Sequence, residues 1–507
     1  MASDIHTQLD GAGVLVATID MPGRSMNVFS AGLMDSLEQL LDEVKANPGI
    51  RAVVLRSGKS AFLAGADLEM VRTFTERART DSPQDLQRLC GRLGRLFRRL
   101  ETNGKPFVAA IHGLALGGGL EVALACHERV AAEKTDVGLP EIKLGLLPGA
   151  GGTQRLPRLV GQSTALKLML TGNPLPAAQA LTLGIIDAVV PLDRLIDEAK
   201  ARALARAATG PAVAPWDTEH WDPVPTRDGE LESVFDELGI DAVERRQYPA
   251  NDAILDCVAG GWSKDMSSAG DWEMDCFVRL IRDPTAGNMI RCLFLDRQRA
   301  AKLVPAPSAD QPPRAAVLGA NAESIRAVLQ RSRVEIVDMA TAGCVTIVTD
   351  NSGASSALNA GSTVRWLQGP VRDNDAAAGV KDTGAVFPAI WVSEPTPYGR
   401  AIEIITDADG QGQNAGLQIA RWLRATPIIS RGASFLGALA AAKADSEHLP
   451  EDERLLAVAM AAAKARARNG GLDTGIADSA AVIAGLFPAH AGGPFTYLAQ
   501  HGHADAH

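Results

Sequence analysis

A glycine run followed by two glutamates is the most informative feature of the chain. Gly117–Gly119 precedes Glu121, Glu141 ends the segment Leu139–Glu141, and a second glycine-rich segment, Pro148–Thr153, follows. Glycines let a ligand approach backbone N–H groups closely. A glycine turn that opens a helix aims those donors at developing negative charge. The pattern predicts an oxyanion site with two carboxylates beside it, which could divide general acid and base roles.

The elements that position these residues form an α/β pattern up to about Val190. The apolar runs Val14–Ile19, Ala52–Leu55 and Phe107–Ile111 are typical of buried strands. A helix begins after the candidate N-cap Ser30, and we expect another over Leu120–Cys126. The apolar face of the first helix comprises Leu33, Leu37, Leu40, Leu41 and Val44. This alternation predicts a layered α/β domain.

The organisation changes after Pro191. Leu195–Ala208 is helical, Pro211–Pro225 has the composition of a linker, and a mostly helical stretch covers about 230–303. The proline-dense segment Pro305–Pro313 cannot continue a helix or a sheet, so it predicts a domain boundary.

The third part outlines a nucleotide-binding βαβ unit. Arg314–Ser324 combines a strand, a glycine and the start of a helix, and Val334–Val337 is a second strand that ends before Asp338. From Gly432 onward the chain is rich in Ala and Leu and is expected to be helical. We therefore expect four regions, 1–210, 211–304, 305–431 and 432–507.

Composition excludes several classes of protein. The 507 residues are 46% apolar and carry a net charge of −10 without a basic run, which argues against nucleic-acid binding. The six cysteines form no CxxC pair or His cluster, so we expect neither a metal site nor a disulfide framework. Met1–Asp10 is polar, unlike a signal peptide, and Phe107–Cys126 carries His112 and Glu121, which are poor in a spanning helix. We expect a cytoplasmic protein without a transmembrane segment.

Four ordered segments resemble the enoyl-CoA hydratase/isomerase (crotonase) family. They are Ser60–Leu68, Lys105–Glu121, Leu139–Leu156 and Ala180–Asp187. The resemblance implies a ClpP/crotonase-like spiral core that binds an acyl-CoA thioester.

The resemblance also implies roles for individual residues. The backbone N–H groups of Ala66 and Gly118 would bind the thioester oxygen. Glu121 would position and deprotonate water, and Glu141 would be the main proton donor to C2. A single glutamate after glycines is more often a solvated or capping side chain, but its place among four matching segments favours catalysis. Further residues are expected near the substrate: Ala64, Gly65, Asp67, Leu68, Gly117 and Arg24. For Arg24, a solvated position on the surface is an equal alternative.

Segments in both halves resemble multifunctional fatty-acid β-oxidation enzymes, in which such a domain is fused to an NAD-dependent 3-hydroxyacyl-CoA dehydrogenase. These segments are Met21–Asn27, Phe294–Gln298 and Leu486–Tyr497. The implied architecture is a helical linker, a Rossmann-like α/β domain and a small helical C-terminal domain.

The dehydrogenase-like half departs from that family in its chemistry. Of a Gly-x-Gly-x-x-Gly motif only Gly319 survives, and Glu323 adds negative charge where a pyrophosphate would bind. Trp391 stands where the family has its catalytic His. Glu403 occupies the position of that histidine's partner, and without the histidine we expect it to be structural. The helical part after Gly432 is also short. We expect a degenerate domain without NAD binding or dehydrogenase activity.

Three interpretations stay open. The leading one is a hydratase that converts 2-trans-enoyl-CoA to 3-hydroxyacyl-CoA and needs no cofactor. The second is an isomerase of 3-enoyl-CoA to 2-enoyl-CoA that uses the same site, with Glu141 alone as its base. The third is a scaffold subunit that docks a thiolase; self-association is also left open.

Overall fold

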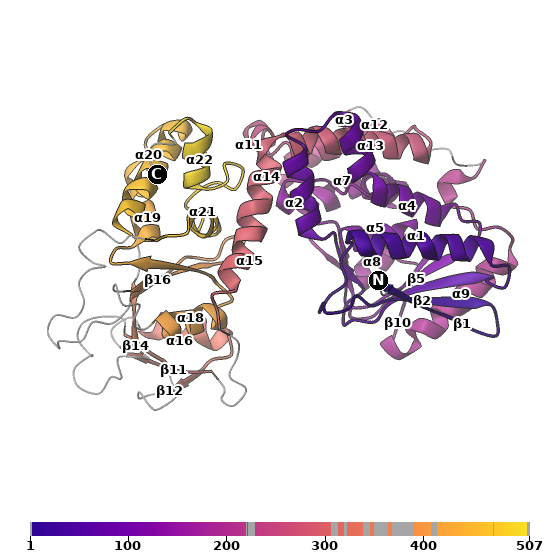
Figure 1. Ribbon diagram of the computed structural model, residues 1–507, viewed down its shortest axis with the longest axis horizontal. Coiled ribbons are helices and arrows are strands. Elements are labelled where there is room, and N and C mark those ends of the chain that lie inside the picture. The colour runs from indigo at the N-terminus through magenta and orange to yellow at the C-terminus, as the bar shows by residue number, and fades with distance from the viewer. Residues whose placement is uncertain are drawn as a thin grey trace. The chain divides into compact units, whose positions relative to one another are not determined.

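The computed structural model describes residues 3–219, 221, 229–305, 313–318, 322–337, 345–348, 363–367, 389–406, 413–469 and 471–503. The chain divides into two compact units, Met1–Gly287 and Asn288–His507 (Figure 1). Among the described residues, no helix has both the length and the apolar character needed to cross a bilayer.

A six-stranded sheet forms the base of the first unit. Its order is β1-β2-β3-β5-β7-β10, with β1 antiparallel to β2 and the other neighbours parallel. The strands are β1 (Ile5–Leu9), β2 (Val14–Ile19), β3 (Ala52–Ser57), β5 (Phe107–Ile111), β7 (Glu128–Ala132) and β10 (Ala188–Val190). The three predicted strands are confirmed, because apolar runs buried on both faces suit the interior of a parallel sheet.

A second, four-stranded sheet positions the glycine-rich loops. It comprises, in order, β4 (Leu63–Ala64), β6 (Leu114–Leu116), β8 (Asp136–Gly138) and β9 (Leu175–Pro176). Each of β3, β5 and β7 is followed by one short strand of this sheet. Since β4 and β6 are parallel neighbours with Ala64 opposite Leu116, the residues after both strands emerge side by side.

Helices surround these sheets. In α1 (Ala31–Ala46) the Ser30 hydroxyl accepts a hydrogen bond from the Leu33 N–H at 3.2 Å, and the predicted apolar face is buried, as expected. The longer helices that follow are α2 (Leu68–Arg77), α3 (Pro83–Cys90), α4 (Arg92–Glu101), α5 (Gly118–Ala125), α6 (Gly152–Val160), α7 (Gln162–Thr171), α9 (Leu195–Ala208), α12 (Ala250–Gly261) and α13 (Met266–Arg282). The shorter helices are α8 (Ala177–Thr182), α10 (Ser233–Leu238) and α11 (Ala242–Gln247).

The second unit contains a seven-stranded sheet ordered β12-β11-β13-β14-β15-β16-β17. Neighbours are parallel except β15 and β16. The strands are β11 (Arg314–Leu318), β12 (Glu335–Val337), β13 (Val345–Val348), β14 (Thr363–Leu367), β15 (Ala389–Val392), β16 (Ala401–Thr406) and β17 (Thr426–Arg431). The predicted βαβ unit is present, whereas Gly319 and Asp338 lie outside the described residues.

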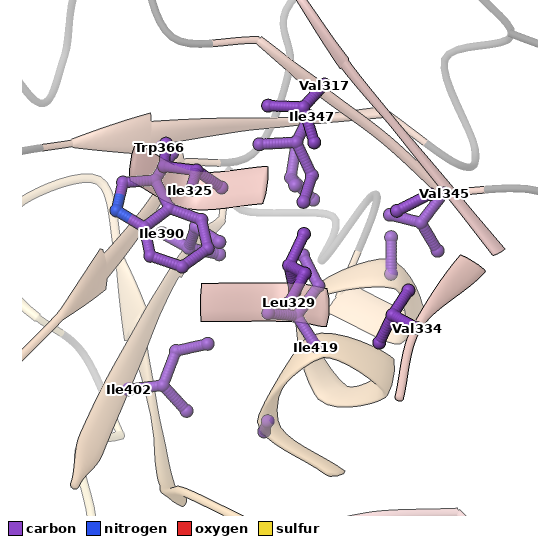
Figure 2. Packing of buried hydrophobic residues seen from close by; sticks show 14 of the residues in the cluster. Val317, Ile325, Leu329, Val334, Val345, Ile347, Trp366, Ile390, Ile402 and Ile419 are labelled. Atoms are coloured by element: carbon purple, nitrogen blue, oxygen red, sulfur yellow. The ribbon is translucent and has the colours of Figure 1, made fainter. Parts of the chain in front are cut away.

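Two helices bury their apolar faces against this sheet, α16 (Ala322–Arg331) and α18 (Gln413–Trp422). Figure 2 shows Leu329 of α16 and Ile419 of α18 directed into the same core, with Trp366 beside Ile325 and Ile390. Strand β11 lies between β12 and β13, and this reversal of strand order is the doubly wound arrangement typical of Rossmann-like domains.

The second unit begins earlier than the expected boundary at residue 305. Helix α14 (Pro284–Ile290) spans the division, and a π-helical segment (Arg291–Leu295) and α15 (Asp296–Ala301) lie beyond it. The Ser479 hydroxyl donates to the Cys292 carbonyl at 2.6 Å, and Arg291 pairs with Asp478 at 3.2 Å. Asp478 and Ser479 both lie on α21 (Thr474–Ile483), one of the C-terminal helices. The others are α19 (Phe435–Asp445), α20 (Glu451–Arg468) and α22 (Pro494–Gln500). These contacts tie residues 288–304 to the second unit, whereas the sequence placed them in a separate region, 211–304, together with the helices that precede them.

Candidate active site

The glycine triplet allows close contacts between backbone segments. Gly117 has φ 54° and ψ −125°, a conformation that side chains disfavour. A Cβ on Gly119 would lie 2.2 Å from the carbonyl oxygen of Leu63, and one on Gly118 would lie 3.1 Å from the Phe29 ring. Helix α5 therefore starts directly against β4, a contact that only glycine permits at residue 119.

The loop after β4 lies beside this helix start. The Phe29 N–H donates to the Gly65 carbonyl at 2.9 Å, and the Asp67 N–H donates to the Phe29 carbonyl at 2.8 Å. Among the described residues no backbone carbonyl accepts from the N–H of Ala66, which lies between these two bonds, or from that of Gly118. The structure thus brings together the two loops that carry the predicted oxyanion donors.

Glu121 projects from the first turn of α5 and is only 3% exposed. Its Oε1 accepts hydrogen bonds from the N–H groups of Ala150 at 2.7 Å and Gly152 at 2.9 Å. Burial raises the pKa of Glu121 above its ordinary value, while these two hydrogen bonds act in the opposite direction because they favour the carboxylate. Both donors belong to the second glycine-rich segment noted in the sequence.

Glu141 is the first residue of a short 3₁₀ turn (Glu141–Leu144). A Cβ on Gly117 would lie 2.6 Å from Glu141 Oε1, so the carboxyl group lies against the glycine triplet. Its Oε2 is buried and has no hydrogen-bond partner in the part of the chain that the structure describes. Burial, and then the charge of Glu121, raise the pKa of Glu141 well above its ordinary value. Glu141 thus favours its protonated form.

The remaining predicted residues lie on the same two loops or near them. Ala64 ends β4, and Leu68 begins α2. Arg24 Nη2 pairs with Asp67 Oδ2 at 2.6 Å, and Asp67 also caps α2 by accepting from the Glu69 N–H at 3.0 Å. The Arg24 side chain is 46% exposed, so it lies at the rim of the loop.

A third buried carboxylate, Glu273, was not anticipated from the sequence. It lies on α13 and is 2% exposed. Its Oε1 accepts from the Gly151 N–H at 2.7 Å, and its Oε2 accepts from the N–H of Thr153 at 3.2 Å and from the Thr153 hydroxyl. Burial, and then the charge of Glu121, raise the pKa of Glu273 to about 8. A glutamate on the apolar face of a helix, at helical spacing from Ala269, Cys276 and Leu280, is the signal that could have revealed it.

A cavity of about 780 Å³ lies against the same loop. Gly149, Gly151 and Glu273 line it, together with Met274 and several arginines of α3 and α4. Neither Glu121 nor Glu141 is among its lining residues. Within the described residues, no group of three or more His, Cys, Asp or Glu side chains is arranged to hold a metal ion.

In the second unit, Trp391 on β15 lies opposite Glu403 on β16. Glu403 is fully buried, and its carboxyl group accepts from the hydroxyls of Ser430 and Ser434 and from the N–H groups of Phe435 and Leu436. Burial raises the pKa of Glu403, and these four donors oppose the shift. The carboxylate therefore anchors the N-terminus of α19.

A family model described as "Enoyl-CoA hydratase/isomerase" matches residues 10–220. Residues 10–220, about two fifths of the chain, thus carry a domain similar to the enoyl-CoA hydratase/isomerase family. The resemblance to the crotonase fold in the sequence is thereby confirmed, and the matched segment contains Glu121, Glu141 and the two loops that carry the predicted oxyanion donors. Glu273 lies beyond it.

Curated relatives extend the similarity past that segment. The "Fatty acid oxidation complex subunit alpha" of Shewanella amazonensis is 39% identical over 288 residues, which are 56% of this chain and 39% of the relative. The protein of the same name from Shewanella loihica is 34% identical over 408 residues, which are 75% of this chain and 55% of the relative. The matched parts of this chain thus span between two fifths and just over half of these relatives' length.

Solved structures of enoyl-CoA hydratases also match. The enoyl-CoA hydratase from Bacillus anthracis is 26% identical, with a TM-score of 0.37, over 60% of this chain and 98% of that protein.

Proposed function

We propose that the first unit is an enoyl-CoA hydratase. The observation that carries this proposal is the contrast between two buried carboxyl groups that flank one pair of glycine-rich loops. Two backbone N–H groups hold Glu121 and favour its ionised form, whereas Glu141 has a buried, unpartnered oxygen and favours its protonated form. This difference in environment assigns the role of general base to Glu121 and the role of general acid to Glu141.

The reaction follows from these environments. The thioester oxygen of a 2-trans-enoyl-CoA accepts hydrogen bonds from the N–H groups of Ala66 and Gly118, which stabilise the enolate that forms on that oxygen. Glu121 takes a proton from the water whose oxygen bonds to C3, and Glu141 gives its proton to C2. The product is a 3-hydroxyacyl-CoA. Loss of one oxyanion donor typically costs about 2.7–4 kcal/mol of barrier.

Hydration of crotonyl-CoA and of longer 2-enoyl-CoA thioesters tests the proposal. We expect Glu121→Gln and Glu141→Gln each to lower kcat by about 10²–10⁴-fold, since each removes one proton-transfer group. Asp271→Asn, an exposed carboxylate on α13, is the control for general loss of charge. Unchanged turnover in both glutamate variants would rule out the assignment.

Isomerisation of 3-enoyl-CoA to 2-enoyl-CoA is the second candidate, because the matching family includes isomerases and Glu141 alone could move the proton. An isomerase needs no activated water. If isomerisation is the principal activity, Glu121→Gln will retain most turnover of 3-enoyl-CoA while Glu141→Gln loses it; equal losses would favour the hydratase.

For the second unit we propose that dehydrogenase activity and NAD binding are absent. The Trp391 indole offers no group that accepts a proton from a 3-hydroxyl, and the Glu403 carboxyl group is already occupied by four donors. Glu323 adds negative charge in the first turn of α16. Reduction of NAD by 3-hydroxyacyl-CoA, or saturable NAD binding in a calorimetric titration, would refute this.

An interaction role is a further candidate, because the curated relatives are named as subunits of a complex. We propose a thiolase as the partner. Co-purification of the full chain with a thiolase, lost on truncation after about residue 305, would support it, and a monodisperse, fully active single protein would count against it.

A further inference from the structure

Glu121 and Glu273 accept hydrogen bonds from alternate N–H groups of one loop. Glu121 binds the N–H groups of Ala150 and Gly152, and Glu273 binds those of Gly151 and Thr153. Four successive backbone donors thus point alternately at a carboxyl group from α5 and one from α13. We infer that Glu273 is a positioning residue, which fixes this loop so that its other two N–H groups hold Glu121 in place. The inference rests on the proposed hydratase function.

Neighbouring contacts show that α12 and α13 brace the loop and α6 at several points. Gln154 Nε2 donates to the Cys257 carbonyl at 3.0 Å, and Arg158 Nη2 donates to the Gly261 carbonyl at 2.9 Å. Of these contacts, only those of the Glu273 carboxyl group involve Gly151 and Thr153, the two residues that alternate with the Glu121 donors. Loss of its carboxyl group would leave the buried Gly151 and Thr153 N–H groups without their acceptor, so the loop would rearrange.

Glycine at residues 151 and 152 makes the loop dependent on these carboxyl groups. Gly151 has φ +99°, and a Cβ on Gly152 would lie 2.9 Å from Glu121 Oε1. Glycine carries the largest conformational freedom of any residue, so the conformation must be fixed from outside. The carboxyl groups of Glu121 and Glu273 do so from two sides.

The titratable and charged groups that face Glu273 come from four elements. They are Glu121 of α5, Arg155 of α6, Glu141 of the 3₁₀ turn and Cys257 of α12. Since burial favours a neutral Glu273 carboxyl group, a glutamine has a similar shape and no charge, but its amide nitrogen cannot accept from the Thr153 N–H as Glu273 Oε2 does.

Two variants of the full chain test the inference. We expect Glu273→Ala to lower kcat for crotonyl-CoA hydration about tenfold or more with KM little changed, because a displaced catalytic group loses rate rather than affinity. Glu273→Gln should lose less kcat at pH 7 than Glu273→Ala, since its amide oxygen can still accept from the Gly151 N–H and its NH2 can donate to the Thr153 hydroxyl, which leaves only the Thr153 N–H without an acceptor. Asp271→Ala, on the same helix, is the matched control and should match the wild type.

Two further measurements distinguish positioning from a merely structural role. In Glu273→Ala the weakened bonds from Ala150 and Gly152 should raise the pKa of Glu121, so the acidic limb of the pH profile of kcat/KM moves to higher pH. Amide hydrogen exchange in the peptide Pro148–Leu156 should be faster than in the wild type.

The outcomes separate the two proposals. Wild-type kcat in Glu273→Ala, an unshifted acidic limb, or equal loss in the alanine and glutamine variants would overturn the positioning role. A wild-type protein without hydration would refute the proposed function instead, and the exchange measurement would then still decide whether Glu273 orders the loop.

Discussion

At the scale of single residues, the site uses three carboxyl groups whose surroundings differ although their side chains are identical. Glu121 has two N–H donors on one oxygen, Glu141 has a buried oxygen without a partner among the described residues, and Glu273 binds a loop on its far side. In the proposed hydratase, the environment rather than the residue type therefore separates the base, the acid and the positioning residue.

The buried Glu273 also predicts a pH dependence of stability. Its pKa is about 8 in the folded protein, above the ordinary 4.5, so between these values the folded state holds a proton that the unfolded state has released. The free energy of unfolding of the wild type should consequently fall, relative to Glu273→Gln, as pH rises from about 4.5 to 8. Urea unfolding of both proteins at pH 5, 6, 7 and 8 measures the difference, and a constant offset would contradict the expectation.

At the scale of elements, the contact between β4 and α5 predicts a steric effect. Gly119→Ala would place a methyl group 2.2 Å from the Leu63 carbonyl oxygen, so the helix start must shift away from the oxyanion loop. We expect lower thermal stability and lower hydration activity. Gly270→Ala is the matched control, because nothing lies within 4 Å of its added Cβ and alanine favours helix by about 1 kcal/mol. Equal melting temperatures of the two variants would contradict this account.

Local patterns were enough to predict many elements. The bounds of Val14–Ile19, Phe107–Ile111 and Leu195–Ala208 match the structure, because each run carries its own periodicity and stop signals. Glu121 and Glu141 could be singled out because the glycines beside them are local in sequence. Glu273 could not, because its partners are 120 and 122 residues away and only tertiary packing brings them together.

At the scale of the whole molecule, a feature recurs in both units: a buried glutamate accepts hydrogen bonds from the N-terminal region of a helix. Glu273 does so at α6, and Glu403 does so at α19. The sequence predicted a structural role for Glu403, and its four donors agree with that role because removal of the carboxyl group would leave buried polar groups unsatisfied.

Glu403→Ala should therefore destabilise the second unit by several kcal/mol, since each unsatisfied buried group costs about 1–3 kcal/mol. Hydration by the first unit should keep its wild-type kcat. Calorimetric unfolding, combined with the crotonyl-CoA assay, checks both expectations. A loss of turnover at a temperature where the first unit remains folded would contradict the expectation that its activity does not depend on the stability of the second unit.

The alternation of Glu121 and Glu273 along four backbone donors also limits how the proposed hydratase domain can be moved into another protein. The family model ends at residue 220, and a hybrid protein joined there would keep Glu121, Glu141 and the two loops with the predicted oxyanion donors. It would lack α13, and with it half of the acceptors that shape the loop behind the base. On the proposed positioning role of Glu273, a transplanted hydratase domain must therefore reach at least to residue 282, about sixty residues past the end of the segment that the family model matches.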